Sequence, residues 1–133
     1  MGVTPTIHER SADDPRPVLA DDAAQWVVHG FRCTGCGYRL ASLRPRCPVC
    51  RAALEPAVYG PGGVVWAATV LRAGVPDRET PFGLAYVDLD DGPRVLCHLE
   101  HAAVDVPVVA PVPGTRVELS GLTEHDDPQA RLA

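Results

Sequence analysis

Two short stretches of the chain, CTGC at residues 33–36 and CPVC at residues 47–50, decide the character of its first half. Each stretch places two cysteines three positions apart, and ten residues separate the two pairs. Two C-x2-C turns across a short spacer are typical of a zinc ion held by four thiolates. Four thiolates leave no coordination position for water or substrate, so this zinc would be structural and not catalytic. The expected ligands are Cys33, Cys36, Cys47 and Cys50.

These cysteines have two other interpretations, a pair of disulfides or a redox-active C-x2-C turn. The first ten residues, MGVTPTIHER, lack the apolar stretch of a secretory signal, which disfavours disulfides. A thioredoxin-like turn needs a βαβ context, and the surrounding sequence does not predict one. A fifth cysteine, Cys97, alternates with Val95 and Leu99 on one face of a predicted strand. We interpret it as a small buried apolar residue and not as a reactive thiol.

Composition divides the chain into three predicted parts. Residues 1–24 are rich in aspartate and proline, and we expect a poorly ordered arm with at most a short helix. Residues 25–54 form the predicted zinc ribbon, with one strand entering it at 25–32 and another leaving it at 38–41. Residues 55–133 form the remaining predicted domain. With 133 residues, this is one domain of ordinary size or two very small ones.

Charge is unevenly distributed along the chain. The formal net charge is −5, and all 12 basic residues are arginines, which excludes chemistry that needs a lysine. Between Ala23 and Leu54 there are five arginines and no carboxylate. This surplus indicates either a surface that faces an anion or side chains that neutralise the thiolates. Residues 55–133 carry 12 acidic residues and 5 arginines, which opposes binding of a polyanion there.

The second half of the chain contains short alternating apolar segments separated by turns. Strands are expected at 64–72, 81–90, 94–99 and 116–120. Asp91-Gly92 predicts a hairpin of the type I′ kind, and prolines interrupt the connection at 104–113. Residues 124–133 are polar and interrupted by Asp126, Asp127 and Pro128, so we expect a weak last strand and a barrel that is partly open or completed by a partner.

This pattern predicts a mainly β protein, a small four-cysteine zinc ribbon followed by an OB-fold β-barrel. The alternation of a strand assigns side chains to the two faces of the barrel wall. The inward residues are expected to be Gly83, Ala85, Val87, Leu89, Val95, Cys97, Leu99, Val117 and Leu119. The outward residues are expected to be Phe82, Leu84, Tyr86, Arg94, His98 and Arg116. Ligands of OB-folds bind on the face of the second and third strands.

The order of these parts resembles the DUF35 family, also called the OB-fold acyl-CoA-associated family, with its rubredoxin-like zinc ribbon. The resemblance covers about residues 25–122. It is carried by CTGCG at 33–37 and CPVC at 47–50 in the ribbon, by GGVV at 62–65, by PFGLAYVDLDDG at 81–92 and by PGTRV at 113–117. The family usually has a helical segment before the ribbon, and residues 1–24 depart from that pattern.

The resemblance implies an accessory subunit and not an enzyme. Family members pair with thiolase-like enzymes, which include ketothiolases, polyketide acyltransferases and retro-aldolases, and the partner holds the catalytic residues. The resemblance also implies that the chain helps to bind the CoA part of an acyl-CoA. Because arginines bind phosphates and aromatic rings stack on adenine, the candidate surface for acyl-CoA or partner is Arg72, Phe82, Tyr86 and Arg94. Each of them is also an ordinary choice for a solvated surface.

The sequence suggests two other functions less strongly. Zinc ribbons and OB-folds both bind single-stranded nucleic acid, but the acidic barrel makes that partner the weaker alternative. An independent enzyme is not expected, since the five histidines have no identifiable nucleophile or carboxylate partner in the sequence, and we predict no catalytic residue. No apolar run reaches the roughly 18 residues of a membrane span. We therefore expect a cytoplasmic protein without a membrane partner.

Overall fold

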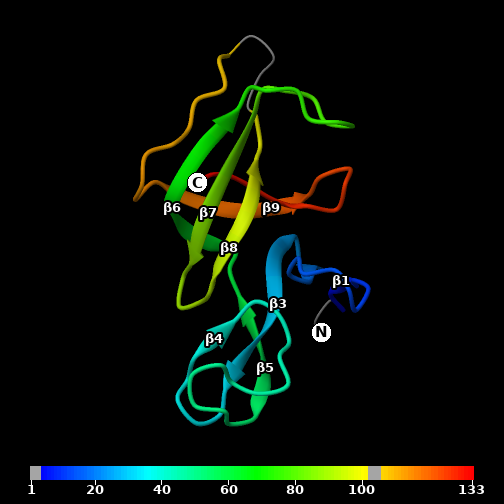
Figure 1. The fold of residues 1–133 in the computed structure, drawn as a ribbon, viewed down its shortest axis with the longest axis vertical. Coiled ribbons are helices and arrows are strands. Elements are labelled where there is room, and N and C mark those ends of the chain that lie inside the picture. Colours follow the sequence, from blue (N-terminus) through cyan, green and yellow to red (C-terminus); the bar gives the residue numbers. More distant parts are fainter. Residues whose placement is uncertain (1–3, 102–105) are drawn as a thin grey trace.

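The computed structural model describes residues 4–101 and 106–133, and within these ranges every regular element is a strand (Figure 1). The mainly β class, with its four-cysteine cluster and barrel, is confirmed. No helix in the described part of the chain is long and apolar enough to cross a membrane. The strands are β1 (Thr6–His8), β2 (Leu19–Asp22), β3 (Gln25–Cys33), β4 (Arg39–Leu40), β5 (Leu54–Tyr59), β6 (Gly62–Leu71), β7 (Phe82–Leu89), β8 (Arg94–Leu99), β9 (Arg116–Leu122) and β10 (Pro128–Leu132).

The first sheet is built around β3. Strands β1, β2, β3 and β4 lie in that order, and β5 pairs with β3 as well. Val28, fully buried, pairs with Leu19 of β2 on one side and with Tyr59 of β5 on the other. The Tyr59 hydroxyl donates a hydrogen bond of 2.7 Å to the carbonyl of Phe31. The segments before and after the predicted ribbon thus both contribute strands to its sheet, and the division of the chain into three domains stays a prediction.

The second sheet closes on itself as a barrel in the order β10-β8-β7-β6-β9 (Figure 1). Strand β10 runs antiparallel to β9 and parallel to β8. The expectation of a barrel left open or completed by a partner is therefore wrong, because the chain supplies the closing strand itself. Pro128 is tolerated because it begins that strand, and Asp127 just before it is buried among cationic partners.

The predicted alternation of the barrel wall is confirmed. Ala85, Val87, Val95, Cys97 and Val117 are at most 4% exposed and belong to the barrel core. On the other face Tyr86, Arg94 and Arg116 are exposed, and the remaining outward residues are partly buried. The period of two thus separates the residues that stabilise the barrel from those that can meet a partner.

The N-terminal arm differs from the sequence expectation. It contains the strands β1 and β2, and within its described residues no helix. Alternation over three or four residues is too short a pattern to predict a strand, and the two strands form by pairing, β2 with the edge of β3 and β1 with β2. His8 of β1 also stacks on Trp26 of β3, with the ring centres 5.1 Å apart.

A cluster of charges around Asp127 ties the arm to the barrel. Arg16 of the arm and Arg78 of the β6–β7 loop donate to the two Asp127 carboxylate oxygens at 3.2 and 2.6 Å. His98 of β8 lies 3.4 Å from the same carboxylate. Arg16 also donates to the carbonyl of His125, and these links hold the arm against the β9–β10 turn. We call these four side chains, Arg16, Arg78, His98 and Asp127, the Asp127 cluster.

Of the two connections expected in the barrel, the hairpin differs in its turn type, and the described part of the proline-broken segment agrees with the expectation. The β7–β8 hairpin turns at Asp91, but Gly92 does not take the positive φ that a type I′ turn requires at both central residues, so that turn type is wrong. Asp91 takes a φ of 50° instead. In the proline-broken connection, residues 104 and 105 lie outside the described residues, and 106–113 contain no strand.

Candidate functional site

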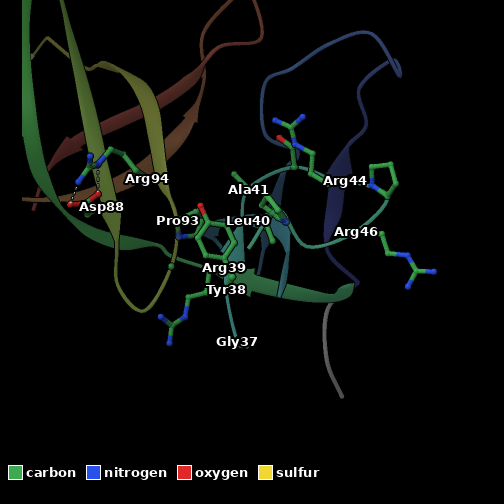
Figure 2. A pocket seen from close by; sticks show the side chains of 14 residues that line it. Gly37, Tyr38, Arg39, Leu40, Ala41, Arg44, Arg46, Asp88, Pro93 and Arg94 are labelled. Carbon is green, nitrogen blue, oxygen red and sulfur yellow. Dashed lines mark hydrogen bonds and ion pairs between the residues drawn. The ribbon is translucent and has the colours of Figure 1, made fainter. Parts of the chain in front are cut away.

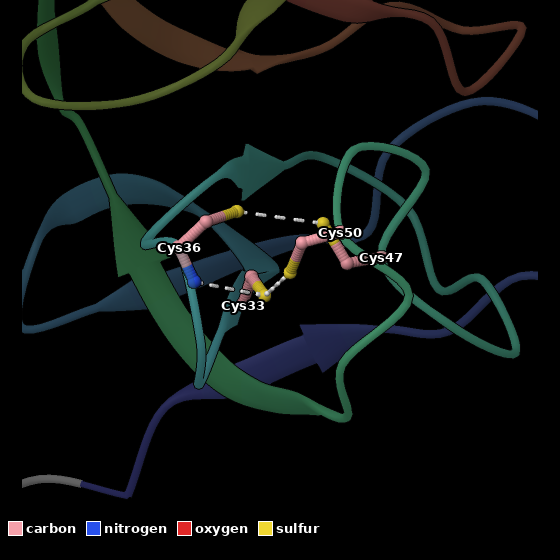
Figure 3. A group of neighbouring side chains, drawn as sticks. All are labelled: Cys33, Cys36, Cys47 and Cys50. Atoms are coloured by element: carbon pink, nitrogen blue, oxygen red, sulfur yellow. Dashed lines mark hydrogen bonds between the residues drawn. The ribbon is translucent and has the colours of Figure 1, made fainter.

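The four predicted ligands come together in one cluster at the end of the ribbon (Figure 3). Their sulfur atoms all lie within 4.8 Å of one another, with 3.3 Å between Cys33 and Cys50 and 3.7 Å between Cys36 and Cys47. Four sulfurs at about 2.3 Å from one tetrahedral ion lie about 3.8 Å apart. The cluster therefore fits a single metal ion, and all four thiols are free of disulfides.

The two C-x2-C turns have the same backbone design. The amide of Gly37 donates to the carbonyl of Cys33 at 3.1 Å, and the amide of Arg51 donates to the carbonyl of Cys47 at 2.9 Å. Gly37 and Arg51 both take a positive φ, 77° and 65°. Each turn is thus closed by a left-handed residue that follows its second cysteine, a conformation that glycine adopts most easily.

Backbone amides point at the sulfurs. The amides of Gly35 and Cys36 donate to the Cys33 sulfur at 3.3 and 3.4 Å, and the amide of Val49 donates to the Cys47 sulfur at 3.3 Å. The hydrogen bond from Cys36 leads the effects that lower the pKa of the Cys33 thiol to about 6. Amides that stabilise a thiolate prepare it to bind a cation.

Cys97 has the opposite environment. Its side chain is fully buried in the barrel core, and burial raises the pKa of its thiol to about 12. A thiol in this state is not a nucleophile near neutral pH. The interpretation of Cys97 as a packing residue is confirmed.

On the outer barrel face, two of the four predicted surface residues meet around a tryptophan. Tyr86 of β7 lies edge-on to Trp66 of β6, with the ring centres 6.1 Å apart. The guanidinium of Arg94 lies 3.7 Å above the Trp66 ring and also donates to Asp88 at 2.7 and 3.2 Å. The hydrogen bond to Asp88 raises the pKa of Arg94. We call Trp66, Tyr86, Arg94 and the neighbouring Leu96 the Trp66 patch.

The other two predicted surface residues lie elsewhere. Phe82 begins β7 and stacks on His98, with the ring centres 5.2 Å apart. Arg72 follows β6 and reaches the carbonyl of Val108 at 3.5 Å. Because Phe82 precedes Tyr86 by four strand residues, about 13 Å separates them along β7. Phe82 and Tyr86 share the outer face of β7, but the four residues do not form one cluster.

Trp66 is the surface residue that the sequence reasoning missed. It lies where the pairing of β6 with β7 is irregular, between Val65 and Ala67. Its side chain is 51% exposed, although it lies in a long apolar stretch. Alternation along the strand from the buried Val65 would have placed Trp66 on the outer face. A tryptophan that faces outward is typical of a binding surface.

A four-cysteine ribbon followed by a closed five-stranded barrel defines the class of protein, a ribbon–OB-fold protein. The family described as the C-terminal OB-fold domain of ChsH2 matches residues 57–121. A solved structure, the Ltp2–ChsH2(DUF35) aldolase, aligns with a TM-score of 0.62 and 25% identity over 80% of this chain and 83% of that chain. A search of curated proteins gave no match. The barrel of this chain is thus similar to the OB-fold domain of a DUF35 protein, and the predicted resemblance to that family is confirmed.

Proposed function

We propose that the chain is a non-catalytic accessory subunit of a thiolase-superfamily enzyme that acts on acyl-CoA substrates. The observation that carries the proposal is the likeness to the Ltp2–ChsH2(DUF35) aldolase, because it spans four fifths of both chains and includes an aldolase among its named components. A retro-aldolase is also one of the partner enzymes that the family resemblance implies. In this proposal the partner supplies the catalytic residues and this chain stabilises it.

The ribbon contributes a rigid end to the subunit. We propose that the bound metal is zinc, because four thiolates in a cluster of this size suit zinc and leave no open coordination position. The ion would supply no reaction chemistry here. Its effect would be to hold the two C-x2-C turns together in a segment that has little apolar core.

The Trp66 patch is the part of the barrel that we propose as a partner contact. Trp66, Tyr86 and Leu96 are 51%, 45% and 45% exposed on strands β6, β7 and β8, which are firmly paired in the barrel wall. Large aromatic side chains held on rigid strands, with an arginine beside them, have the composition of binding hot spots. We also propose that the chain helps to bind the CoA part of the substrate. The candidate residues for this contact are Arg72, Phe82, Tyr86 and Arg94.

The proposal is tested by association with a partner. The full chain, expressed with a thiolase-like enzyme of its native host, should co-purify with that enzyme at a fixed ratio and raise its activity or its thermal stability. The chain alone should show no thiolase, aldolase or hydratase turnover on acyl-CoAs. Repeated capture from the native host without any thiolase-fold protein would count against the proposal.

Trp66→Ala should weaken binding to that partner by about 30-fold, because truncating a central tryptophan costs about 2 kcal/mol of binding free energy. Its effect on folding should be small, since half of the side chain is exposed. Leu132→Ala is the matched control, because it removes an apolar side chain that is 64% exposed at the end of β10. Equal affinities of the two variants, measured by titration calorimetry, would contradict the assignment of the Trp66 patch.

The alternative function has one observation in its favour. Trp66, Tyr86 and Arg94 on an OB-fold face could stack on the bases of single-stranded nucleic acid. The acidic excess of residues 55–133 opposes it. We expect filter binding at low salt to show no tight retention of single-stranded DNA. Retention that is tight, sensitive to salt and lost in Trp66→Ala would favour the alternative.

A further inference from the structure

Strand β8 of the barrel has one edge that is only partly paired. On one side it runs antiparallel to β7 along its whole length, from Arg94 to Leu99. On the other side, among the described strands, only β10 pairs with it, and only at His98 and Leu99. The first half of β8, residues 94–96, therefore has a neighbouring strand on one side alone.

The register shows where the backbone groups of β8 point. The amide of Leu89 donates to the carbonyl of Pro93 at 3.2 Å, and the amide of Glu100 donates to the carbonyl of Ala130 in β10 at 2.8 Å. Backbone groups of successive strand residues point to opposite edges, so the odd-numbered residues of β8 bond to β7 and the even-numbered ones point away from it. The N–H and C=O of Leu96 thus face the unpaired side, and no loop backbone of the described residues bonds to them there.

A cleft of about 410 Å³ lies along this edge. The barrel lines it with Arg94, Val95, Leu96, His98 and Asp127, and the rest of the lining is residues 15–17 of the arm and 41–42 of the ribbon. Val95 is 4% exposed and packs in the barrel core, so it reaches the cleft through its backbone. Leu96 is 45% exposed. The edge of β8 is therefore open to a ligand.

The charged groups of the cleft already compensate one another. The Arg94 side chain lies against Asp88 (Figure 2) and donates to it at 2.7 Å. Arg16 donates to Asp14 at 2.6 Å and to Asp127 at 3.2 Å. The remaining lining is largely apolar and includes two prolines of the arm. A ligand of this cleft therefore needs apolar groups and no net charge.

An extended polypeptide is the ligand whose backbone fits such an edge. It presents an N–H and a C=O on the same side at every second residue, about 6.7 Å apart, as the edge of β8 does. Arg94 and Leu96 line the cleft and also belong to the Trp66 patch. A protein that covers this patch therefore reaches the unpaired edge as well.

We propose that an extended apolar segment of the partner enzyme adds to β8 at residues 94–96 as a further strand. This inference rests on the proposed function and deepens it, because it names the kind of contact that the partner makes. The added strand accepts a hydrogen bond from the Leu96 amide and donates one to the Leu96 carbonyl. Its outward side chains extend the outer barrel face beside the Trp66 patch.

Amide hydrogen exchange of the metal-loaded full chain, followed by NMR, tests whether the edge is free. The Leu96 amide should exchange rapidly, although the amides of Val95 and Cys97, which bond to β7, should be protected. A protected Leu96 amide in dilute solution would overturn the proposal, because the edge would then be paired already. Protection that rises with protein concentration would assign the edge to a second copy of the chain and would overturn the partner segment.

Random peptides displayed on phage and selected on the full chain test the binding mode without the enzyme. A selected peptide should be apolar and should protect the Leu96 amide. N-methylation of the peptide should abolish binding at every second position and have little effect at the positions between, because only alternate amides face β8. Selection of no such peptide, or equal effects of N-methylation at all positions, would contradict strand addition.

Leu96→Pro should weaken binding of the selected peptide about tenfold, because it removes the donor that faces the cleft. The pairing with β7 should persist, since proline is tolerated at an edge where its nitrogen points away from the sheet. Leu96→Ala is the matched control, because it removes the side chain and keeps the N–H, and it should lose less affinity. Metal content and melting temperature identify any variant that fails to fold, and N-methylation of the peptide tests the same hydrogen bonds with the protein unchanged.

The complex with the partner enzyme separates this inference from the proposed function. The Leu96 amide should become protected when the complex forms. A stable complex in which this amide exchanges as fast as in the free chain would overturn strand addition and leave the proposed function intact. Peptide binding without any partner association would overturn the proposed function and, with it, the enzyme as the source of the segment.

Discussion

Cys36→Ala should release the metal and unfold the ribbon, which is the largest effect expected for a single substitution in this protein. The Cys36 side chain is exposed, so its removal takes little packing from the fold. Between Cys33 and Ala53 the buried apolar residues are the ligands Cys33 and Cys47 together with Leu40. Binding of structural zinc contributes about 10–16 kcal/mol in small zinc modules, so a ribbon with so little core depends on its metal.

Elemental analysis and limited proteolysis measure this effect. The wild type should hold about one zinc per chain. Cys36→Ala should hold little zinc and should be cleaved rapidly within residues 34–53. Cys97→Ala is the control, because it removes a buried thiol from the barrel and should keep its zinc while losing some stability to the cavity. Full zinc content in Cys36→Ala, or a wild type without metal whose four cysteines are paired as disulfides, would contradict the assignment of the metal centre.

Asp127→Ala should lower the free energy of unfolding by about 2–3 kcal/mol. The Asp127 side chain is 12% exposed and accepts hydrogen bonds from Arg16, Arg78 and Thr123. Removing one partner of a buried ion pair costs about 3–5 kcal/mol, because the remaining charge stays buried. We expect less here, since the Arg16 and Arg78 side chains are 35% and 27% exposed and recover part of their hydration.

Asp90→Ala is the matched control for the Asp127 cluster. Asp90 also accepts an arginine, Arg116, but the two side chains are 52% and 54% exposed, and such surface pairs contribute less than about 1 kcal/mol. Urea unfolding should show a larger loss of unfolding free energy in Asp127→Ala than in Asp90→Ala. In limited proteolysis of Asp127→Ala, the N-terminal arm should be cut first. Equal stability losses in the two variants would contradict a special role of the Asp127 cluster.

The pH dependence offers a second check on Asp127. Burial by itself would raise the pKa of this carboxyl, but the hydrogen bond from Arg78, the charge of His98 and the hydrogen bond from Arg16 outweigh burial and lower the pKa. A carboxyl with a lowered folded pKa contributes stability above its ordinary value near 3.9, and this contribution is lost as pH falls through the folded value. The stability of Asp127→Ala should therefore change less than that of the wild type between about pH 4 and the folded pKa.

The metal ligands and the barrel wall could be predicted from the sequence because their signals are local. The spacing of Cys33, Cys36, Cys47 and Cys50 is set by the geometry of one tetrahedral ion, and no distant contact is needed to recognise it. The faces of β7 and β8 follow from alternation, which a strand imposes on its own residues. The family resemblance rested on these same segments.

Pairings between segments far apart in the chain were decided only by the tertiary structure. Strands β1 and β2 carry no pattern of their own and depend on β3, and β10 closes the barrel although Asp127 and Pro128 read as interruptions. Taken alone, a charged Asp127 beside a strand would destabilise the fold. Arg16, which lies 111 residues earlier, and Arg78 compensate its charge. A cleft lined by Arg44 and Arg46 of the ribbon and by Arg94 of the barrel likewise exists because the ribbon packs beside the β7–β8 turn. The spacing of neighbouring residues determines local chemistry, whereas charge compensation and concave surfaces arise only when separate segments meet.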